Sequence, residues 1–223
     1  MDATTLQSRI YAGYAQAAKR LGLSYAQYRP AGTANPLAAQ QGSLLAAFNA
    51  EDMSYGKPNR YGDPVWYGLF DGRMTRVGDY LVGPAGTLFI ASQQLHLPIQ
   101  CVECNVTVRV TRTVTAVGVG AVGYGGPCGE PGANGDSFLI GDASGAGWPA
   151  SALLFGQREK SISGLPSSSQ QIGWRILLPK SVPQSVVFQA SDTVSCSLGR
   201  RYVIQGAELT DMGWRLTTTE LHA

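Results

Sequence analysis

The sequence has few charged residues, only two histidines and only four cysteines among its 223 residues. Charged residues make up 14% of the chain, against about 25% in an average soluble domain. No apolar run approaches the roughly 18 to 20 residues that a membrane-spanning helix needs, and no basic segment followed by an apolar one opens the chain. We therefore expect neither membrane insertion nor signal-peptide export. The net charge of +2 is too small for a protein that coats nucleic acid.

The scarcity of histidine restricts catalysis. His222 is the penultimate residue, so a histidine-dependent reaction would depend on His96 alone, in the sequence Leu95-His96-Leu97-Pro98. No serine lies in a nucleophile-elbow sequence, and no pair of carboxylates has a spacing that indicates acid–base chemistry. The sequence therefore predicts a protein without catalytic residues.

Cysteine usage indicates buried free thiols. Cys101 and Cys104 have the spacing of half a zinc site, but Cys128 and Cys196 are isolated and no histidine lies near them. Residues three apart on a strand point to opposite faces, which disfavours chelation by Cys101 and Cys104. Four cysteines are also too few for a disulfide-dependent secreted fold, so reduced thiols are expected.

Two further motifs have a simpler explanation than ligand binding. Gly118, Gly120 and Gly123 match the dinucleotide fingerprint, but the following residues, 124–129, cannot form the helix that would face a pyrophosphate. Asp136 and Asp142 lie in a glycine-rich stretch whose spacing fits no calcium loop, which favours solvated turn residues. We expect no cofactor and no metal.

Glycine is abundant, with 28 residues, and its distribution divides the chain. The patterns predict a mainly β protein with two small β-barrel or sandwich-like units, an N-terminal helix, an extended arm and a long glycine-rich insertion. The predicted segments are an N-terminal helix and extended arm at 1–64, a first β unit at 65–117, a glycine-rich loop or insertion at 118–171, and a second β unit at 172–223. Residues 65–223 are expected to form one composite β domain.

The N-terminal helix is predicted from an apolar stripe between Thr4 and Leu21, with Thr4 or Thr5 as its cap and Gly22 as a left-handed stop. This stripe either packs on the core of the chain or docks on another subunit. The candidate interface residues, from the stripe and from two other aromatic positions, are Leu6, Ile10, Tyr14, Leu21, Tyr28 and Trp148.

An internal repeat appears when the chain is compared with itself at an offset of 113 residues. Asp79 then matches Asp192, Gly86 matches Gly199, and each copy follows an apolar run that contains a tryptophan. Each unit is predicted to be a hairpin in which the Asp and the Gly are structural turn residues. Two such units can pair into one barrel or sandwich, although chance similarity between short hairpins remains the alternative.

Several strings resemble virion structural proteins of tailed bacteriophages. They include Leu6-Gln-Ser-Arg-Ile-Tyr-Ala-Gly-Tyr14, Val77-Gly78-Asp79-Tyr80-Leu81-Val82, Gly147-Trp148-Pro149-Ala150-Ser151 and Arg200-Arg201-Tyr202-Val203. The Asp, Gly and aromatic pattern of the repeat also resembles the small β-barrel of phage head-completion and neck proteins. The glycine-rich insertion departs from that compact pattern.

The resemblance implies a non-enzymatic component of the neck or head-to-tail connector, as a collar or adaptor. Such a protein is made in the host cytoplasm and placed in the virion as a homo-oligomeric ring, with 12 or 6 copies as the expected orders. Its partners would be further copies of itself and the portal, tail or fibre proteins, while DNA passes through the channel without specific binding.

Two alternatives stay open at this point. One is an adaptor for tail-fibre or baseplate attachment, with the glycine-rich loop as its docking surface. The other is a carbohydrate-binding β-sandwich, because tryptophans can serve as sugar-stacking platforms; the chain has four, at Trp66, Trp148, Trp174 and Trp214.

Overall fold

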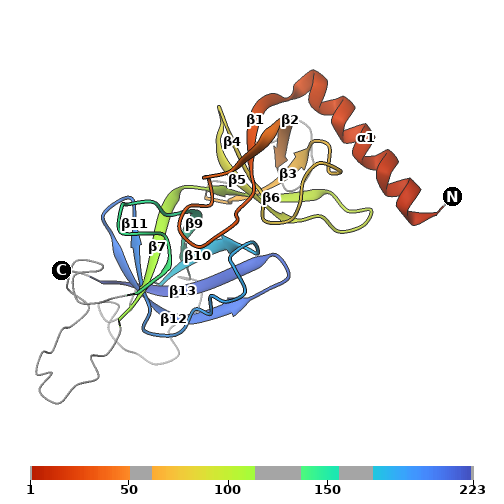
Figure 1. Cartoon of the computed structure of the whole chain (residues 1–223). Coiled ribbons are helices and arrows are strands. Elements are labelled where there is room, and N and C mark those ends of the chain that lie inside the picture. The colour runs from red at the N-terminus through yellow and green to blue at the C-terminus, as the bar shows by residue number, and fades with distance from the viewer. Residues whose placement is uncertain (1, 51–61, 114–136, 156–172, 222–223) are drawn as a thin grey trace, which may run out of the picture.

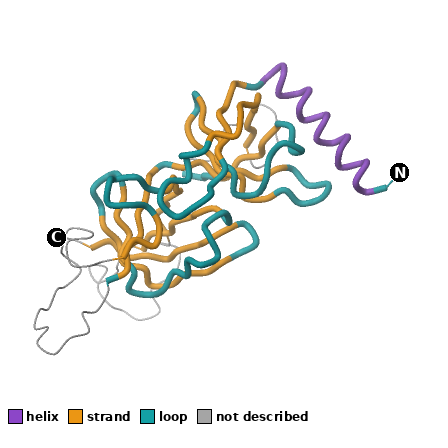
Figure 2. The backbone as a smooth tube through the Cα atoms, viewed as in Figure 1, coloured by secondary structure: helices purple, strands orange, loops and turns teal. Residues whose placement is uncertain are grey.

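The computed structural model describes residues 2–50, 62–113, 137–155 and 173–221, and it shows a mainly β protein with one N-terminal helix and two sheets (Figures 1 and 2). This confirms the predicted fold class. The helix is α1, Ala3–Leu21, and the strands of the first sheet are β1 Leu23–Tyr28, β2 Gln40–Ala50, β3 Val65–Leu69, β4 Tyr80–Gly83, β5 Gly86–Ser92 and β6 Ile99–Cys104. The strands of the second sheet are β7 Val106–Arg112, β8 Ser137–Ile140, β9 Trp148–Phe155, β10 Gly173–Pro179, β11 Thr193–Cys196, β12 Arg201–Leu209 and β13 Gly213–Leu221.

The first sheet closes into a barrel with the strand order β1-β2-β3-β6-β5-β4, which we call barrel 1. Neighbouring strands are antiparallel throughout, and β4 pairs with β1 to close the ring. Alternate residues of each strand point inward, as the pleat requires. Tyr25, Leu81, Ile90 and Cys101 are among the residues that fill the interior.

The second sheet has the order β11-β12-β13-β10-β9-β7-β8, and a further pairing of β11 with β7 closes six of its strands into a second ring. We call this ring barrel 2. Strand β8 lies outside the ring and pairs with the end of β7. The interior of barrel 2 contains Trp148, Ile176, Val194 and Leu216, all fully buried.

The two barrels have the same topology. Matching β1 to β7, β2 to β9, β3 to β10, β4 to β11, β5 to β12 and β6 to β13 makes every strand pairing of one barrel correspond to a pairing of the other. The registers then equate Arg29 with Arg112 and Trp66 with Trp174. They also align the β-bulges after Ile90 and Ile204. The chain is a tandem repeat of one barrel, more extensive than the hairpin repeat visible in the sequence.

The barrels share one apolar core. Outward-facing residues of barrel 1, among them Tyr80, Phe89 and Val102, belong to the same buried cluster as the interior of barrel 2. The hydroxyl of Tyr80 donates a hydrogen bond of 2.8 Å to the carbonyl oxygen of Pro149. We call this contact the seam between the barrels.

A single residue, Asn105, connects β6 of barrel 1 to β7 of barrel 2. Its side-chain amide donates to the carbonyl of Ala152 at 2.9 Å, and its side-chain oxygen accepts from the backbone nitrogen of Ala152 at 2.8 Å. Its own backbone nitrogen donates to the carbonyl of Ala150. Three hydrogen bonds therefore hold the connection between the barrels to β9.

Helix α1 lies against β2 and β3 of barrel 1. Asp2 caps it by accepting from the backbone nitrogen of Thr5 at 2.8 Å, so the cap lies two or three residues before the predicted Thr4 or Thr5. Gly22 ends the helix with an extended φ of −86° rather than a left-handed one. A side chain there would meet the carbonyl oxygen of Ala18 at 2.5 Å, so close approach explains the glycine.

The structure also differs from the predicted division of the chain. Residues 29–39 form a loop, but β1 and β2 are strands of barrel 1 rather than parts of an arm. The first half of β2 is exposed and carries Gln, Gly and Ser, which hid its strand character. Strand β7 belongs to barrel 2 rather than to a first unit ending at 117, and β8 and β9 lie inside the segment predicted as an insertion. Residues 114–136 and 156–172 of that segment lie outside the described residues.

Candidate functional site

A buried carboxylate stands where barrel 1 closes between β1 and β4. Arg29 donates two hydrogen bonds to Asp79, at 2.8 Å from Nε and 2.7 Å from Nη2, and Gln27 donates a third at 2.7 Å. The backbone nitrogen of Arg76 also donates to Asp79, at 3.0 Å. The Asp79 side chain is 2% exposed, so these donors compensate the cost of burying its charge.

Barrel 2 has the same arrangement where β7 meets β11. Arg112 donates to both carboxylate oxygens of Asp192, at 2.7 and 2.8 Å, and the backbone nitrogen of Gln189 donates at 2.7 Å. Contact with Asp192 raises the pKa of Arg112, as Asp79 raises that of Arg29, chiefly through these hydrogen bonds. Each Arg–Asp pair connects the two strands at which its barrel closes, and the Asp also binds the loop before it. Both pairs therefore stabilise the fold.

The sequence assigned Asp79, Asp192, Gly86 and Gly199 to turns. Both carboxylates accept a backbone N–H from three residues earlier, and the backbone nitrogen of each Asp donates to the carbonyl of that same residue, which closes a turn. Gly86 and Gly199 have φ values of +124° and +76° in the hairpins that follow. The arginine partners were not foreseen, because Arg29, just after β1, and Arg112, the last residue of β7, lie 50 and 80 residues from their aspartates in the sequence.

The described thiols are buried or half-buried and unsuited to nucleophilic chemistry. Cys101 points into barrel 1 and Cys104 packs against the core of the seam, so the two face opposite sides of β6. Burial raises the pKa of both thiols well above the ordinary value, and the charge of Glu103 contributes for Cys104. Cys196 is also a free buried thiol. Cys128 lies outside the described residues.

The tryptophans take structural positions. Trp148 is fully buried, and its indole nitrogen donates to the carbonyl of Thr33 at 2.6 Å, which ties the 29–39 loop to barrel 2. The assignment of Trp148 to an interface is therefore corrected: no partner can reach its side chain. Trp66 donates to Glu103 at 2.9 Å, and Trp174 packs against Tyr202 and under Arg200.

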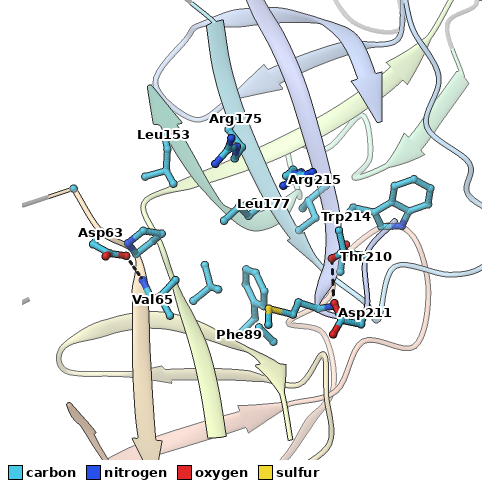
Figure 3. Close-up of a pocket in the computed structure, with 17 residues that line it drawn as sticks. Asp63, Val65, Phe89, Leu153, Arg175, Leu177, Thr210, Asp211, Trp214 and Arg215 are labelled. Carbon is cyan, nitrogen blue, oxygen red and sulfur yellow. Dashed lines mark hydrogen bonds between the residues drawn. The ribbon is translucent and has the colours of Figure 1, made fainter. Parts of the chain in front are cut away.

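A pocket of about 610 Å³ opens at the seam, between the β5–β6 surface of barrel 1 and strands β9, β10 and β13 of barrel 2 (Figure 3). Its apolar floor includes Val65, Phe89, Leu153 and Leu177, and we call it the seam pocket. Two guanidinium groups and two carboxylates stand around the floor, those of Arg175, Arg215, Asp63 and Asp211. Trp214 also lines the pocket, but its indole is turned away from the centre and packs on Phe188. This disfavours sugar stacking there.

A second surface feature is the end of barrel 1 beside the start of α1. Leu95 and Leu97, in the loop between β5 and β6, are 64% and 52% exposed, and Leu6 of α1 is 42% exposed. The side-chain oxygen of Gln7 accepts from the backbone nitrogen of His96 at 2.6 Å and holds the loop to the helix. We call Leu6, Leu95 and Leu97 the apolar tip.

The other predicted interface residues divide into exposed and packed positions. Leu21 is exposed and Ile10 is half-buried. Tyr14 packs against the interior cluster of barrel 1, and Tyr28 packs against the cluster at the seam. The hydrogen bond between Gln7 and His96 joins the helix turn after Leu6 to the loop of Leu95 and Leu97, which the sequence analysis did not select because both lie in a loop without periodicity.

The parts of the chain that the structure describes contain no group of three or more metal-ligating side chains, and no helix there is long and apolar enough to cross a membrane. Asp142 lies in a turn, where Ser144 lowers the pKa of its carboxyl; Asp136 lies outside the described residues. No protein-family model, no curated protein and no solved structure matches the chain.

Proposed function

We propose that this chain is a non-enzymatic structural protein of a tailed-phage virion, and that copies of it form a ring in the neck or head-to-tail connector around the DNA channel. The observation that carries the proposal is the tandem pair of barrels with a common core. Such a body suits a wall element, because its parts cannot slide or rotate independently when the core between them is continuous. The resemblance of its sequence strings to phage virion proteins agrees with this function.

The distribution of polar groups supports a structural function rather than an enzymatic one. The buried carboxylates Asp79 and Asp192 are fully engaged with arginine and backbone donors. The thiols of Cys101 and Cys104 have pKa values raised by burial, which disfavours the thiolate. These are arrangements that stabilise a fold.

The exposed apolar residues support assembly. Leu6, Leu21 and Leu23 are 42%, 58% and 52% exposed on or next to α1. Exposed large apolar side chains on a chain with only 14% charged residues favour contact with other subunits. A ring needs two different surfaces on each copy, and α1 lies at the opposite end of the molecule from barrel 2 (Figure 1).

Two measurements test the proposal together. The mass of the purified chain in solution gives its oligomeric state, and antibody labelling of particles made by the genome that encodes the chain gives its place. We expect a closed oligomer of defined mass and label at the junction of head and tail. A chain that is a stable monomer and is missing from the particles would contradict the proposal.

The same particles distinguish a connector from a fibre adaptor. Residues 118–136 are replaced by a short Gly-Ser linker in the phage genome. A connector function predicts that particles with the shortened chain either assemble with their fibres or fail at the junction of head and tail. Particles that are intact but lack fibres would assign the chain to fibre attachment instead.

A further inference from the structure

Helix α1 occupies on barrel 1 the position that barrel 1 occupies on barrel 2. The helix contacts β2 and β3, and barrel 1 contacts β9 and β10, which are the equivalents of β2 and β3. A single residue joins α1 to β1 and another joins β6 to β7, and the registers make these two residues, Gly22 and Asn105, equivalent. Gly22 lies against Ala46 of β2, as Asn105 lies against Ala150 of β9. Figure 1 shows the helix and the two barrels in a row, with barrel 1 in the middle.

The loop after the third strand of each barrel takes part in both contacts. In barrel 1 this loop contains Gly72, and a side chain there would meet the ring of Tyr11 of α1 at 2.6 Å. In barrel 2 the loop contains Ser181, whose hydroxyl donates to the carbonyl of Gly78 of barrel 1 at 2.8 Å. Counted from the registers of β3 and β10, Gly72 corresponds to Lys180, the neighbour of Ser181. The same loop therefore contacts α1 in one barrel and barrel 1 in the other.

The turn before the sixth strand is also shared by the two contacts. The backbone nitrogen of His96, before β6, donates to the side-chain oxygen of Gln7 of α1 at 2.6 Å. Before β13, the side-chain amide of Gln94 of barrel 1 lies 3.5 Å from a carboxylate oxygen of Asp211. The second strand, the loop after the third strand and the turn before the sixth strand therefore form one surface on each barrel, which we call the receiving surface. It is covered by α1 on barrel 1 and by barrel 1 on barrel 2.

The helix is bound to its receiving surface less extensively than barrel 1 is bound at the seam. Only Gln7 and Ala18 of the 19 helix residues are buried, and the side-chain nitrogen of Gln7 has no hydrogen-bond partner in the described part of the chain. A buried polar group without a partner lowers stability. At the seam, by contrast, Tyr80 and Phe89 are 0% and 2% exposed within a continuous apolar core. Displacing α1 should therefore cost less free energy than opening the seam.

Barrel 2 lacks the apolar row with which barrel 1 enters the seam. In barrel 1 this row crosses β4, β5 and β6, and its equivalent in barrel 2 crosses β11, β12 and β13. The first row is Tyr80, Phe89 and Val102, and the second is Thr193, Val203 and Thr219. Terminal units of repeat proteins likewise carry a more polar outer surface, which ends the stacking of units. The threonines therefore disfavour a third barrel in the same row.

We propose that α1 is a displaceable cap over a barrel-binding surface of barrel 1. The partner that fits the receiving surface under α1 is a β-barrel that presents an apolar row like that of Tyr80, Phe89 and Val102. The native chain engages this row at its own seam and covers the second receiving surface with α1. Copies of the chain are thus kept from adding to one another through this contact. The cap is additional to the proposed ring function and does not depend on it.

Two variants of the full chain test the covered surface. The donor variant carries Thr193→Tyr, Val203→Phe and Thr219→Val, which give barrel 2 the row of barrel 1. The receiver variant carries Ala18→Arg, which places a charge in the buried contact of α1. Its matched control is Gln16→Arg, at an exposed position of the same helix. Circular dichroism and thermal unfolding establish that every variant is folded.

Sedimentation of a fluorescently labelled receiver with unlabelled donor measures the contact. We expect the receiver to bind the donor at least about tenfold more tightly than the Gln16→Arg control does, because α1 still covers the surface in the control. Wild-type chain mixed with the labelled receiver gives the baseline, since its barrel 2 has the threonine row. A donor that binds neither labelled chain above this baseline, or binds both equally, would overturn the cap.

Hydrogen exchange of the wild-type chain tests displacement without any substitution. If α1 leaves the surface while both barrels stay folded, its central backbone amides should exchange at least about tenfold faster than those of β2 and β3. Equal protection of the helix and the strands would show that α1 separates only when the whole chain unfolds, and the cap would then not be displaceable. Neither result bears on the ring function, which is tested by the oligomer mass and by labelling of particles.

Discussion

Barrels 1 and 2 share their strand order and registers, but they fill their interiors with different residues. Barrel 1 pairs large rings with glycines: Tyr25 lies over Gly83, and Phe70 lies over Gly68. At the equivalent positions barrel 2 has Val108 with Cys196, and Leu178 with Ile176. Both barrels have the same pattern of strand hydrogen bonds. They differ in how large and small side chains are distributed over equivalent interior positions. Backbone pairing and the Arg–Asp closures therefore define this barrel more than any one core side chain does.

The closure of each barrel offers the largest expected effect. Asp79→Ala leaves Arg29, Gln27 and the N–H of Arg76 without their acceptor, and we expect a loss of about 3 kcal/mol in the free energy of unfolding. Asp192→Ala should cost about 2 kcal/mol, because barrel 2 has Val110 at the position of Gln27 and so one donor fewer. Urea unfolding measures both. Equal costs would contradict a role for Gln27, and the Gln27→Val variant isolates it.

The division of interior space gives the next effect. A methyl group at position 68 would lie 2.3 Å from the ring of Phe70, which is fully buried, so Gly68→Ala should destabilise the chain by about 2 kcal/mol. Adding Phe70→Leu, the residue that barrel 2 has there, should recover part of that loss. Thermal unfolding of the single and double variants measures the coupling. If the effects of Gly68→Ala and Phe70→Leu on stability are additive, the two side chains do not share one interior volume, and this interpretation is wrong. Gly206→Ala is the control, since its added methyl meets nothing within 4 Å.

A third difference concerns the pairs Trp66 with Glu103 and Trp174 with Glu220. Glu103 accepts the indole N–H of Trp66 at 2.9 Å, whereas Glu220 pairs with Arg200 at 3.7 Å and leaves the nitrogen of Trp174 without a hydrogen bond. Removing the acceptor with Glu103→Ala should therefore cost about 1 kcal/mol, and Glu220→Ala less than half of that. The denaturant midpoints of the Glu103→Ala and Glu220→Ala variants measure the two losses of stability. The comparison fails if Glu220→Ala is the more costly.

The smallest effect at pH 7 is expected at Cys101, whose equivalent in barrel 2 is Thr218. The hydroxyl of Thr218 donates to the carbonyl of Trp174 at 3.3 Å. In barrel 1 the equivalent carbonyl is that of Trp66, which pairs with Cys101 and could accept from a threonine hydroxyl at position 101. Cys101→Thr should change the free energy of unfolding by less than about 1 kcal/mol.

Alkaline pH separates the Cys101 variant from the wild type. Burial raises the pKa of the Cys101 thiol, so its contribution to stability is complete below the unfolded thiol pKa of about 8.5 and is lost as the pH rises above it. The wild type should therefore lose stability between about pH 8.5 and 10.5 more steeply than Cys101→Thr. Identical slopes in urea titrations over this range would show that the thiol stays accessible to solvent.

Some of this architecture could be predicted from the sequence, because part of the repeat keeps a constant spacing. Asp79 and Asp192 are equivalent in the structure and have the offset of 113 residues found in the sequence, whereas the turn after β11 is longer than the turn after β4, so the registers make Gly86 equivalent to Arg200 rather than to Gly199. Arg29 and Arg112 are also equivalent, but Arg29 is 50 residues from Asp79 in the sequence and Arg112 is 80 residues from Asp192, and the longer segment contains the additional strand β8. A gapless comparison misses such a pair, whatever its structural importance.

The helix shows a different limit. Its period was correctly predicted, but periodicity alone does not select between adjacent stripes, which are separated by about 100° of rotation. The barrel contacts Gln7, Tyr11, Tyr14 and Ala18, and Leu6 and Leu21 stay exposed. Tyr11 lies against Gly72, where a side chain would meet its ring at 2.6 Å. Only the tertiary structure shows that the predicted stripe is split, with Tyr14 and Ala18 packed on the barrel and Leu6 and Leu21 exposed.

The connection through Asn105 has a mechanical consequence. Domains joined by flexible linkers can move apart or rotate under load before force reaches the folded domains. Here one residue separates the last strand of barrel 1 from the first strand of barrel 2, and its side chain donates to and accepts from Ala152 of β9. Compression or torque applied to either barrel is therefore transmitted directly to the other barrel. A subunit built in this way is a rigid body, and its resistance to deformation is set by packed side chains rather than by a hinge between the barrels.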